Sequence, residues 1–373
     1  MLAIFLVAWV IIYIISRIFS LEKYGIEIHP LYLLFRTERF NRFLENLANR
    51  RPRLLRTFWN MAVAVAVGEM IFAIYLLSQN LLNFLFEPQS AQRIFLLLPG
   101  ITVSLRWFPY LLVAIGLAIV THETAHGLAS YLERIKTDSV GLVLTPITFG
   151  AFVEPNEDQL KKSSIFSKLR VISSGSLSNL IFGIIVLLLI TGLFSHPSGI
   201  LIINMNKEGP AYDSGIREWD VIKGMNGTDI NNTDDFYFYM SKVTPGETIL
   251  IETNHGERMV TTIPSIYNSS YPVIGIGFID YLPFRFEPVG VAASYHIFQT
   301  LNWVSTLMIN LAVFNMLPLY PLDGDLFLFS IVEERLKDER KSRLVRIILS
   351  IFVLALMVTN IGFSFLKYGF API

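Results

Sequence analysis

Long apolar runs recur along the chain at lengths that match the thickness of a lipid bilayer. A helix that crosses the hydrocarbon core, about 30 Å thick, needs about 20 mostly apolar residues. Six segments approach or exceed that length: Met1–Ile15, Thr57–Phe86, Phe108–Tyr131, Val171–Phe194, His296–Leu317 and Leu344–Leu366. The pattern predicts a polytopic α-helical membrane protein with about six transmembrane helices.

Basic residues between these segments predict the orientation. Lys and Arg are concentrated after the first segment, after the third, and before the last. If six helices alternate in direction, all three basic connections lie on one side, which the positive-inside bias makes cytoplasmic. Both termini and the connection 195–285 are then outside. The first basic connection, Arg36–Arg56, also contains Phe and Leu and predicts an amphipathic helix on an anionic lipid surface.

The connection 195–285 has a different composition from the rest of the chain. It is polar and rich in turn residues, with short β-branched runs such as Ile200–Ile203 and Thr248–Thr253. Asn226-Gly227 lies between apolar residues, a strong signal for a two-residue hairpin turn. These features predict a small soluble domain of mixed α+β structure, inserted between helices four and five.

Composition narrows the functional classes. The chain has 373 residues, of which 53% are hydrophobic and 16% charged, whereas soluble domains carry about 25% charged residues. The 30 basic and 30 acidic residues balance and give no support for a nucleic-acid partner. The chain contains no cysteine, which excludes disulfides, thiolate metal sites and cysteine nucleophiles.

One predicted helix carries the sequence His122-Glu123-Thr124-Ala125-His126. The i, i+4 spacing places both imidazoles on one face, where they can share a metal ion such as zinc, while Glu123 can act on a water at that metal. The flanking residues are apolar, and ionisable groups inside a membrane span are expensive and normally functional. The pattern therefore predicts a catalytic metal site rather than a solvated helix face.

A third metal ligand must come from elsewhere in the chain, and Glu69, His296 and Asp323 are the candidates. Asp323 is the next-to-last residue of the segment Asn315–Gly324, in which two prolines and a glycine interrupt a helix. Irregular backbone at membrane depth occurs only where protein or a water-filled cavity surrounds it. The predicted topology puts this interruption on the same side as His122, so we choose Asp323.

The two motifs together resemble the site-2 protease family of intramembrane zinc metalloproteases. The resemblance runs from about Pro99 onward and includes Gly150–Pro155 and the segment Ser174–Asn179, in which Ser176 replaces a proline usual in the family. It implies one Zn²⁺ per chain, held by His122, His126 and Asp323, with Glu123 as catalytic base. The accessory or substrate-positioning residues that it implies are Asn179, Gly150, Phe152 and Asn315.

The resemblance also implies how substrates bind. The stretch Gly141–Val153 is similar to a membrane-associated β-loop that presents an edge strand to an unwound substrate. The inserted domain is similar to a PDZ domain, which binds extended peptides or C-terminal carboxylates. The expected partners are transmembrane segments of membrane-protein substrates, a ligand of the PDZ-like domain, and the lipid bilayer.

The expected domains follow from these assignments. Residues 1–98 form an N-terminal membrane region, 99–194 the first half of a catalytic membrane core, 195–285 the PDZ-like domain, and 286–373 the second half of the core. The expected reaction is hydrolysis of peptide bonds within or near transmembrane helices, in regulated intramembrane proteolysis or in clearance of signal-peptide remnants.

Two other functions are compatible with parts of the pattern. A membrane metal-ion carrier could use the same His, Asp and Glu cluster, although the chain has no internal repeat of the kind that transporters often show. A catalytically idle homologue could act as a binding scaffold through its PDZ-like domain.

Overall fold

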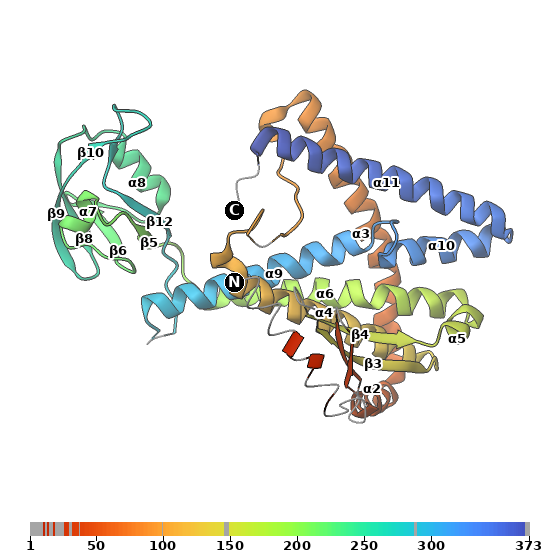
Figure 1. Cartoon of the computed structure of the whole chain (residues 1–373). Coiled ribbons are helices and arrows are strands. Elements are labelled where there is room, and N and C mark those ends of the chain that lie inside the picture. The colour runs from red at the N-terminus through yellow and green to blue at the C-terminus, as the bar shows by residue number, and fades with distance from the viewer. Residues whose placement is uncertain are drawn as a thin grey trace. The chain divides into compact units, whose positions relative to one another are not determined.

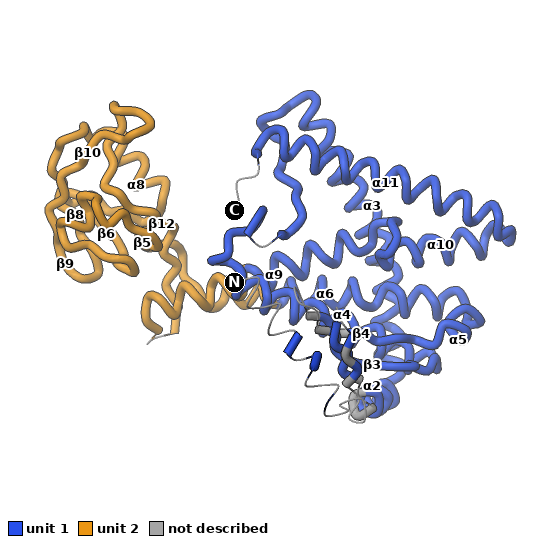
Figure 2. The backbone as a smooth tube through the Cα atoms, viewed as in Figure 1, with its two compact units in different colours: residues 1–185, 303–373 blue, residues 186–302 orange. Residues whose placement is uncertain are grey.

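The computed structural model describes residues 10–11, 13–14, 18, 26–29, 32–36, 38–98, 100–144, 149–286 and 289–369. The first expected span, Met1–Ile15, lies almost entirely outside the described residues. The chain divides into two compact units, residues 1–185 with 303–373 and residues 186–302 (Figure 2). Because α6 and α9 each cross a unit boundary, the chain enters and leaves the second unit through a helix.

Five helices of the described residues are long and apolar enough to cross a membrane. They are α3 (Pro52–Phe86), α4 (Phe108–Leu132), α6 (Ile165–Leu193), α9 (Val291–Asn315) and α11 (Glu339–Tyr368), labelled in Figure 1. Most begin several residues before the apolar run that predicts them. In α11 the reason is a cap, because the Asp338 carboxylate accepts hydrogen bonds from the N–H groups of Arg340 and Lys341 at 3.0 and 3.2 Å.

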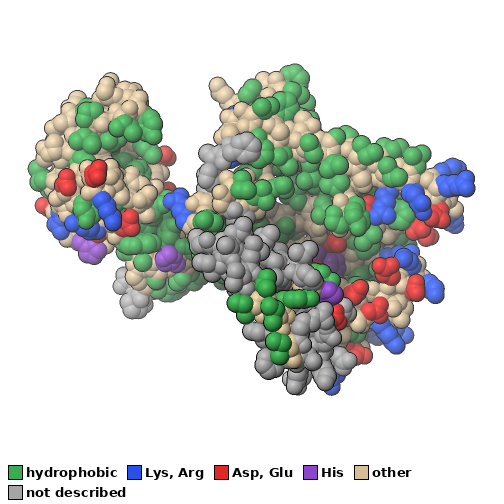
Figure 3. Space-filling model, in the orientation of Figure 1, with side chains coloured by type: hydrophobic (Ala, Val, Ile, Leu, Met, Phe, Trp, Pro, Cys, Tyr) green, Lys and Arg blue, Asp and Glu red, His purple; other side chains and the backbone are tan. Residues whose placement is uncertain are grey.

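Charged side chains gather at one end of the first unit, around the short helix α5 (Glu157–Lys162) and the junction of α10 (Asp323–Leu336) with α11 (Figure 3). Hydrophobic side chains cover much of the middle of the same face. Leu344, Ile351, Phe352 and Val358 of α11 are all more than half exposed. An apolar middle with a charged end is the surface expected of helices that cross a bilayer.

A small antiparallel sheet belongs to the first unit. Its strands lie in the order β1 (Ile26–Ile28), β2 (Leu33–Arg36), β3 (Thr137–Leu144) and β4 (Phe149–Pro155). The family resemblance implies the β-loop that β3 and β4 form, but no signal in the sequence predicts the two strands that precede it. Gly141 allows β2 to approach β3, since a Cβ at this position would overlap the Phe35 carbonyl oxygen. Among the described strands, β4 forms one edge of this sheet.

Helix α2 (Glu38–Arg50) corresponds to most of the expected amphipathic helix. Its Leu44 and Ala48 side chains are buried, whereas Phe43 is 56% exposed. Leu44 lies against α4, because a Cβ on Gly127 would be 2.6 Å from the Leu44 Cδ1 atom. Part of the apolar face of α2 is therefore used inside the protein and is not available to lipid.

Small residues bring the central helices together. Trp59 and Ala62 of α3 form one buried cluster with Ala125 and Ala129 of α4 and with Val171 of α6. Farther along α3, Ala66 and Met70 share a second cluster with residues of α6 and α10 and with Met316, which directly follows α9. Alanine at these contacts lets the backbones approach, which is how helices gain van der Waals contact within a membrane.

Helices α3 and α11, which are 280 residues apart at this contact, are joined by a buried polar cluster. The Asn80 amide nitrogen donates to Asn360 Oδ1 at 2.9 Å and to the Gln92 carbonyl at 3.0 Å, and Asn80 Oδ1 accepts from the Gln92 N–H at 2.7 Å. Buried polar groups that are paired in this way fix one arrangement of neighbouring helices.

The second unit contains a small domain built on an antiparallel sheet. The strand order is β12-β5-β6-β8-β9, with β7 paired to β6, and β10 and β11 form a separate pair. Its strands and helices are β5 (Ile200–Met205), α7 (Pro210–Asp213), β6 (Val221–Met225), β7 (Thr228–Asp229), α8 (Thr233–Met240), β8 (Thr248–Thr253), β9 (Gly256–Thr261), β10 (Ile263–Pro264), β11 (Pro272–Val273) and β12 (Ile276–Asp280). Ile200, Ile222 and Ile249 are fully buried in its core.

The Asn80 cluster yields a test of how α3 is held. We expect Asn80→Ala to lower the free energy of unfolding by about 1–3 kcal/mol, because it leaves the buried Asn360 Oδ1 and the Gln92 N–H without the hydrogen bonds that Asn80 makes to them. The measurement is thermal unfolding of the purified protein in detergent. Gln79→Ala is the matched control, since Gln79 is exposed and bonds only to Asn83 of the same helix among the interactions described. An equal effect of both substitutions would contradict the assignment.

Candidate metal centre

Helix α4 places two imidazoles one turn apart on the same face. The His122 and His126 Nε2 atoms are 3.0 Å apart, with the rings nearly perpendicular at 86°. Both side chains are largely buried, with relative exposures of 13% and 12%. Two ring nitrogens that converge in this way are arranged to bind a common cation.

Asp323 reaches the same point from a break between two helices. Helix α9 ends at Asn315, and α10 begins at Asp323 after an irregular segment that contains the cis Tyr320–Pro321 peptide bond. Asp323 Oδ2 lies 3.1 Å from His122 Nε2 and 3.2 Å from His126 Nε2. Gly324 allows the break to fold tightly, since a Cβ there would overlap the Met316 carbonyl.

The donor set fits a zinc ion. His122, His126 and Asp323 form the group of described residues that could hold a metal, with all ligand atoms within 4.8 Å of one another. Ligands at about 2.0–2.2 Å around a tetrahedral zinc are about 3.3–3.5 Å apart, close to the 3.0–3.2 Å observed. Two imidazoles and one carboxylate also leave a fourth position for water or substrate, as in catalytic zinc sites.

Outer contacts orient the three ligands. His126 Nδ1 lies 2.7 Å from the Val171 carbonyl oxygen, which makes Nδ1 the protonated nitrogen and leaves Nε2 for a metal. The Asn315 amide nitrogen donates to Asp323 Oδ2 at 2.8 Å and lies 3.3 Å from His122 Nε2. Asn315, expected from the sequence as an accessory residue, therefore lies at the ligand cluster itself.

Helix α6 passes directly over the His122 imidazole at Gly175. A Cβ on Gly175 would lie 2.6 Å from both ring nitrogens of His122, so no other residue fits without displacing the ring. One turn later, Asn179 is 2% exposed, and its Oδ1 accepts a hydrogen bond from Thr121 Oγ1 at 2.7 Å. Asn179 thus forms a hydrogen bond between α6 and α4 at Thr121, the residue before His122. This bond also places the Asn179 amide against α4.

Glu123 contacts the small sheet of the first unit. Its Oε2 atom accepts a hydrogen bond from the backbone N–H of Val153, in β4, at 3.0 Å. Gly150 and Phe152 lie on the same strand and alternate with Ala151 and Val153 along it. A Cβ on Gly150 would be 3.0 Å from Val143 in the neighbouring strand.

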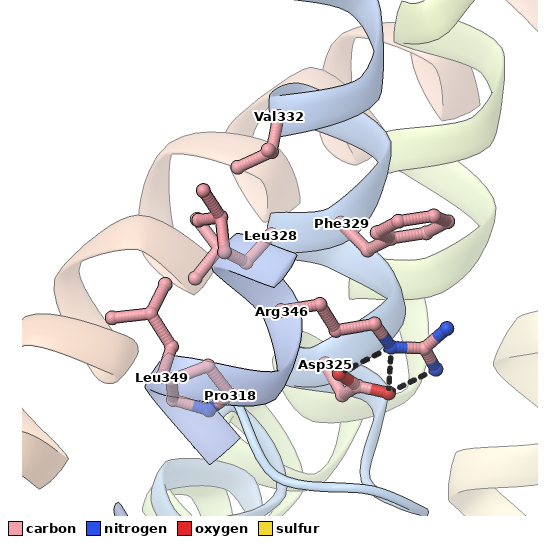
Figure 4. Close-up of a pocket in the computed structure, with 8 residues that line it drawn as sticks. Pro318, Asp325, Leu328, Phe329, Val332, Arg346 and Leu349 are labelled. Atoms are coloured by element: carbon pink, nitrogen blue, oxygen red, sulfur yellow. Dashed lines mark hydrogen bonds and ion pairs between the residues drawn. The ribbon is translucent and has the colours of Figure 1, made fainter. Parts of the chain in front are cut away.

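An ion pair anchors the start of α10, two residues after Asp323. Arg346 Nε donates to both carboxylate oxygens of Asp325 at 2.9 and 3.0 Å, and its Nη2 also contacts Oδ2 (Figure 4). Asp325 is 2% exposed, and the Arg346 guanidinium lies 4.7 Å from the centre of the Phe329 ring. The pair ties α10 to α11 and so holds the break that presents Asp323.

The other two candidates for the third ligand are not part of this cluster. Glu69 is 6% exposed on α3, and neither of its carboxylate oxygens has a hydrogen-bond partner among the described residues. His296 belongs to the second unit, where its ring lies 5.4 Å from that of Trp219. The choice of Asp323 from the helix interruption agrees with the geometry.

Some contacts at the site cannot be predicted from residue types. The Val171 carbonyl and the Val153 N–H are backbone groups, which any residue type supplies. Gly175 lies in the segment Ser174–Asn179 that carries the family resemblance. Its contact with His122 could not be predicted from the sequence, because that contact depends on how α6 packs against α4.

The chain is similar to known proteins over most of its length. The model of peptidase family M50 matches residues 110–359. The chain is 26% identical to an uncharacterized protein of Methanocaldococcus jannaschii over 342 residues, covering 91% of this chain and 87% of that protein. It is 25% identical to zinc metalloprotease RasP of Geobacillus kaustophilus, covering 48% of this chain and 54% of the relative, so the match spans about half of that enzyme's length.

Among solved structures, the PDZ domain of an SdrC-like protein from Listeria monocytogenes matches with 21% identity and a TM-score of 0.20. The match covers 22% of this chain and 87% of that domain.

The contact between Gly175 and His122 gives a test of the metal centre. We expect Gly175→Ala to weaken zinc binding about 10- to 100-fold, because the new methyl group displaces an imidazole ligand. The measurement is zinc content and affinity of the purified protein, by elemental analysis and competition with a chelator. Gly192→Ala is the control on the same helix, since a Cβ there meets nothing within 4 Å. Unchanged zinc affinity in Gly175→Ala would contradict the geometry.

Proposed function

The chain belongs to peptidase family M50, the site-2 protease family, and we propose that it is an intramembrane zinc endopeptidase that cuts membrane proteins within or near a transmembrane helix. One observation carries the proposal: His122, His126 and Asp323 converge within 3.2 Å of one another among apolar helices, with Glu123 adjacent on the same helix. The proposed substrates are membrane anchors of regulatory proteins or remnants of signal peptides.

The proposed roles follow from the donor set. His122, His126 and Asp323 hold one zinc ion, which when bound supplies a Lewis acid and lowers the pKa of a bound water. The Glu123 carboxylate accepts a proton from the attacking water and returns it to the amine of the leaving peptide. Asn315 keeps Asp323 in place, and Asn179 fixes the helix beside His122 through Thr121.

Strand β4 supports a proposal for how the substrate is held. Helical substrates keep their amides bonded internally, so a protease must first unwind them. An edge strand can capture the unwound segment through main-chain hydrogen bonds, which are independent of side-chain identity. Gly150 and Phe152 lie on this strand, and Val153 brings it to Glu123.

We infer a PDZ-like role for the domain between the fourth and fifth spans. Its antiparallel sheet ends at β12, which contacts α8, as shown by the Phe278 ring 4.5 Å from that of Phe236. A strand edge next to a helix is the arrangement by which PDZ domains bind extended peptides or free C-termini. The proposed ligand is such a peptide segment of a membrane-protein partner.

We propose a cell-membrane location with six spans and with the metal centre toward the cytoplasm. Residues 99–194 and 286–373 form the catalytic core, residues 1–98 an added membrane region, and the PDZ-like domain and both termini lie outside. The proposal is supported by the basic residues of the three connections on one side.

Substitution of Glu123 separates this function from its alternatives. We expect Glu123→Gln to lower cleavage of a fluorogenic transmembrane substrate by at least about 100-fold with zinc retained, because the proton acceptor is lost but the ligands remain. We expect Asp323→Asn to lose both activity and zinc affinity. Chelation should abolish cleavage by the wild-type protein, and added zinc should restore it.

Liposomes that contain the purified protein and the substrate allow both cleavage and zinc flux to be measured. Zinc transport that persists in Glu123→Gln, with no cleavage by the wild-type protein, would contradict the protease proposal in favour of a carrier. Binding of partners that is unaffected by Glu123→Gln and Asp323→Asn, again without cleavage, would favour a scaffold.

The absence of cysteine makes the proposed orientation directly measurable. We expect Ser270→Cys, in the β10–β11 loop of the second unit, to react with a membrane-impermeant maleimide added to intact cells. We expect Lys162→Cys, at the end of α5, to react only after the membrane is opened. Both positions are exposed, so burial does not explain a difference. The reverse pattern would contradict the orientation.

A further inference from the structure

The backbone of β4 makes a specific contact with Glu123. The Val153 N–H donates to Glu123 Oε2 at 3.0 Å, so this N–H points away from β3 and toward α4. Successive N–H groups of a strand point to opposite sides. The N–H groups of Phe149 and Ala151 therefore face the same side as that of Val153, along an edge where no strand of the described residues pairs with β4.

Packing holds this contact in place. Val153 is 8% exposed, and a Cβ on Gly127 of α4 would be 3.2 Å from its Cγ1 atom. The same virtual Cβ would be 2.6 Å from Leu44 of α2, so α2, α4 and β4 meet at Gly127. Because Gly127 follows His126 directly, the position of β4 is fixed relative to the helix that carries both imidazoles and Glu123.

We propose that the Val153 N–H positions the Glu123 carboxylate and, because it is used in this way, ends the stretch of β4 that can pair with a substrate. The inference rests on the proposed function and adds two features to it: the group that orients the base, and the register of the bound peptide. A substrate strand pairs with the N–H groups of Phe149 and Ala151 and finds none at Val153, where it meets Glu123 instead.

Chemistry supports the first feature. A hydrogen bond from a backbone N–H to an ionised carboxylate is charge-assisted and stronger than one between neutral groups. The bond to Oε2 fixes the rotation of the carboxylate and leaves Oε1 to exchange the proton with water and with the leaving amine. Without it the carboxylate rotates, and a misplacement of about 1 Å can cost about 100-fold in rate.

Geometry supports the second feature. Strand pairing alone specifies no position along a peptide, because every residue offers the same main-chain groups. A ladder that ends at a fixed residue of β4 sets how far the paired stretch of any substrate lies from Glu123. The substrate peptide bond that follows the residue paired with Ala151 then lies next to Glu123. Cleavage therefore occurs at one position relative to the paired stretch, whatever side chains the substrate carries.

The test removes single N–H groups by proline substitution, which an edge strand tolerates where the N–H does not face the neighbouring strand. We expect Val153→Pro to lower kcat about 10- to 100-fold because Glu123 loses its hydrogen bond, and to leave KM, zinc content and the cleavage site found by mass spectrometry unchanged, because proline also offers no N–H to the substrate at this position. Val153→Ala is the comparison, because it keeps the N–H but loses most of the packed side chain, and we expect its kcat to stay well above that of Val153→Pro. We expect Ala151→Pro to raise KM with little change in kcat.

Binding of the uncleaved substrate gives a readout that does not depend on turnover. In a zinc-loaded Glu123→Gln background, we expect Ala151→Pro to weaken substrate binding and Val153→Pro to leave it unchanged. If Val153→Pro weakens binding as much as Ala151→Pro does, this N–H serves the substrate and the inference is wrong. Normal kcat in Val153→Pro would also overturn it.

Two further measurements keep the outcome interpretable. If Val153→Pro fails to fold, as judged by its Tm and zinc content, replacement of Val153 by its α-hydroxy analogue exchanges the N–H for an oxygen and keeps the side chain. The same predictions then apply to that variant. Failure of the wild-type protein to cleave any transmembrane substrate would count against the proposed function, whereas the binding comparison would still test the register.

Discussion

Three ligand groups held within 3.2 Å of one another among apolar helices form the constraint on which the rest of the membrane unit depends. Ionisable groups are costly in such surroundings unless they are paired or bound to a cation. The helices must therefore approach closely enough to exclude lipid from the cluster and present polar partners to it. Gly175 lets α6 lie on His122, Gly324 lets the α9–α10 break fold back, and the Val171 carbonyl and the Asn315 amide meet the remaining polar atoms.

Contacts farther from the three ligand groups hold the helices and the strand that carry or surround these groups. The Asp325–Arg346 pair joins the start of α10 to α11, and α11 is in turn joined to α3 through Asn80 and Asn360. On the opposite side of α4, Gly127 receives side chains from both α2 and β4. Helix α4, which carries His122, Glu123 and His126, thus packs against helices and a strand that are themselves held by buried contacts. Supporting contacts of this kind keep the geometry of a site within narrow limits.

Sequence predicted the parts of this structure that are encoded locally. Hydropathy located all five described helices that are long and apolar enough to cross a membrane, and the i, i+4 histidine spacing located two of the three residues that could hold a metal, because both signals depend on one helix alone. Asp323 was identifiable because two prolines and a glycine mark a break. The β1–β2 pair was not predicted, since β2 pairs with β3 about 100 residues later and its short run carries no period of its own. The Val153 and Val171 contacts use the backbone, which leaves no trace in side-chain identity.

The position of Asp323 in the chain has a consequence for biogenesis. It follows His126 by 197 residues, and the whole second unit is synthesised between them. At about 5–20 residues per second, translation needs about 10–40 s to pass from one ligand to the other. During that interval the inserted helices hold two imidazoles and Glu123 but no third ligand, so the nascent protein lacks a complete centre. If His122, His126 and Asp323 hold the zinc ion as proposed, hydrolytic competence is delayed until translation has passed α9 and reached Asp323 at the start of α10.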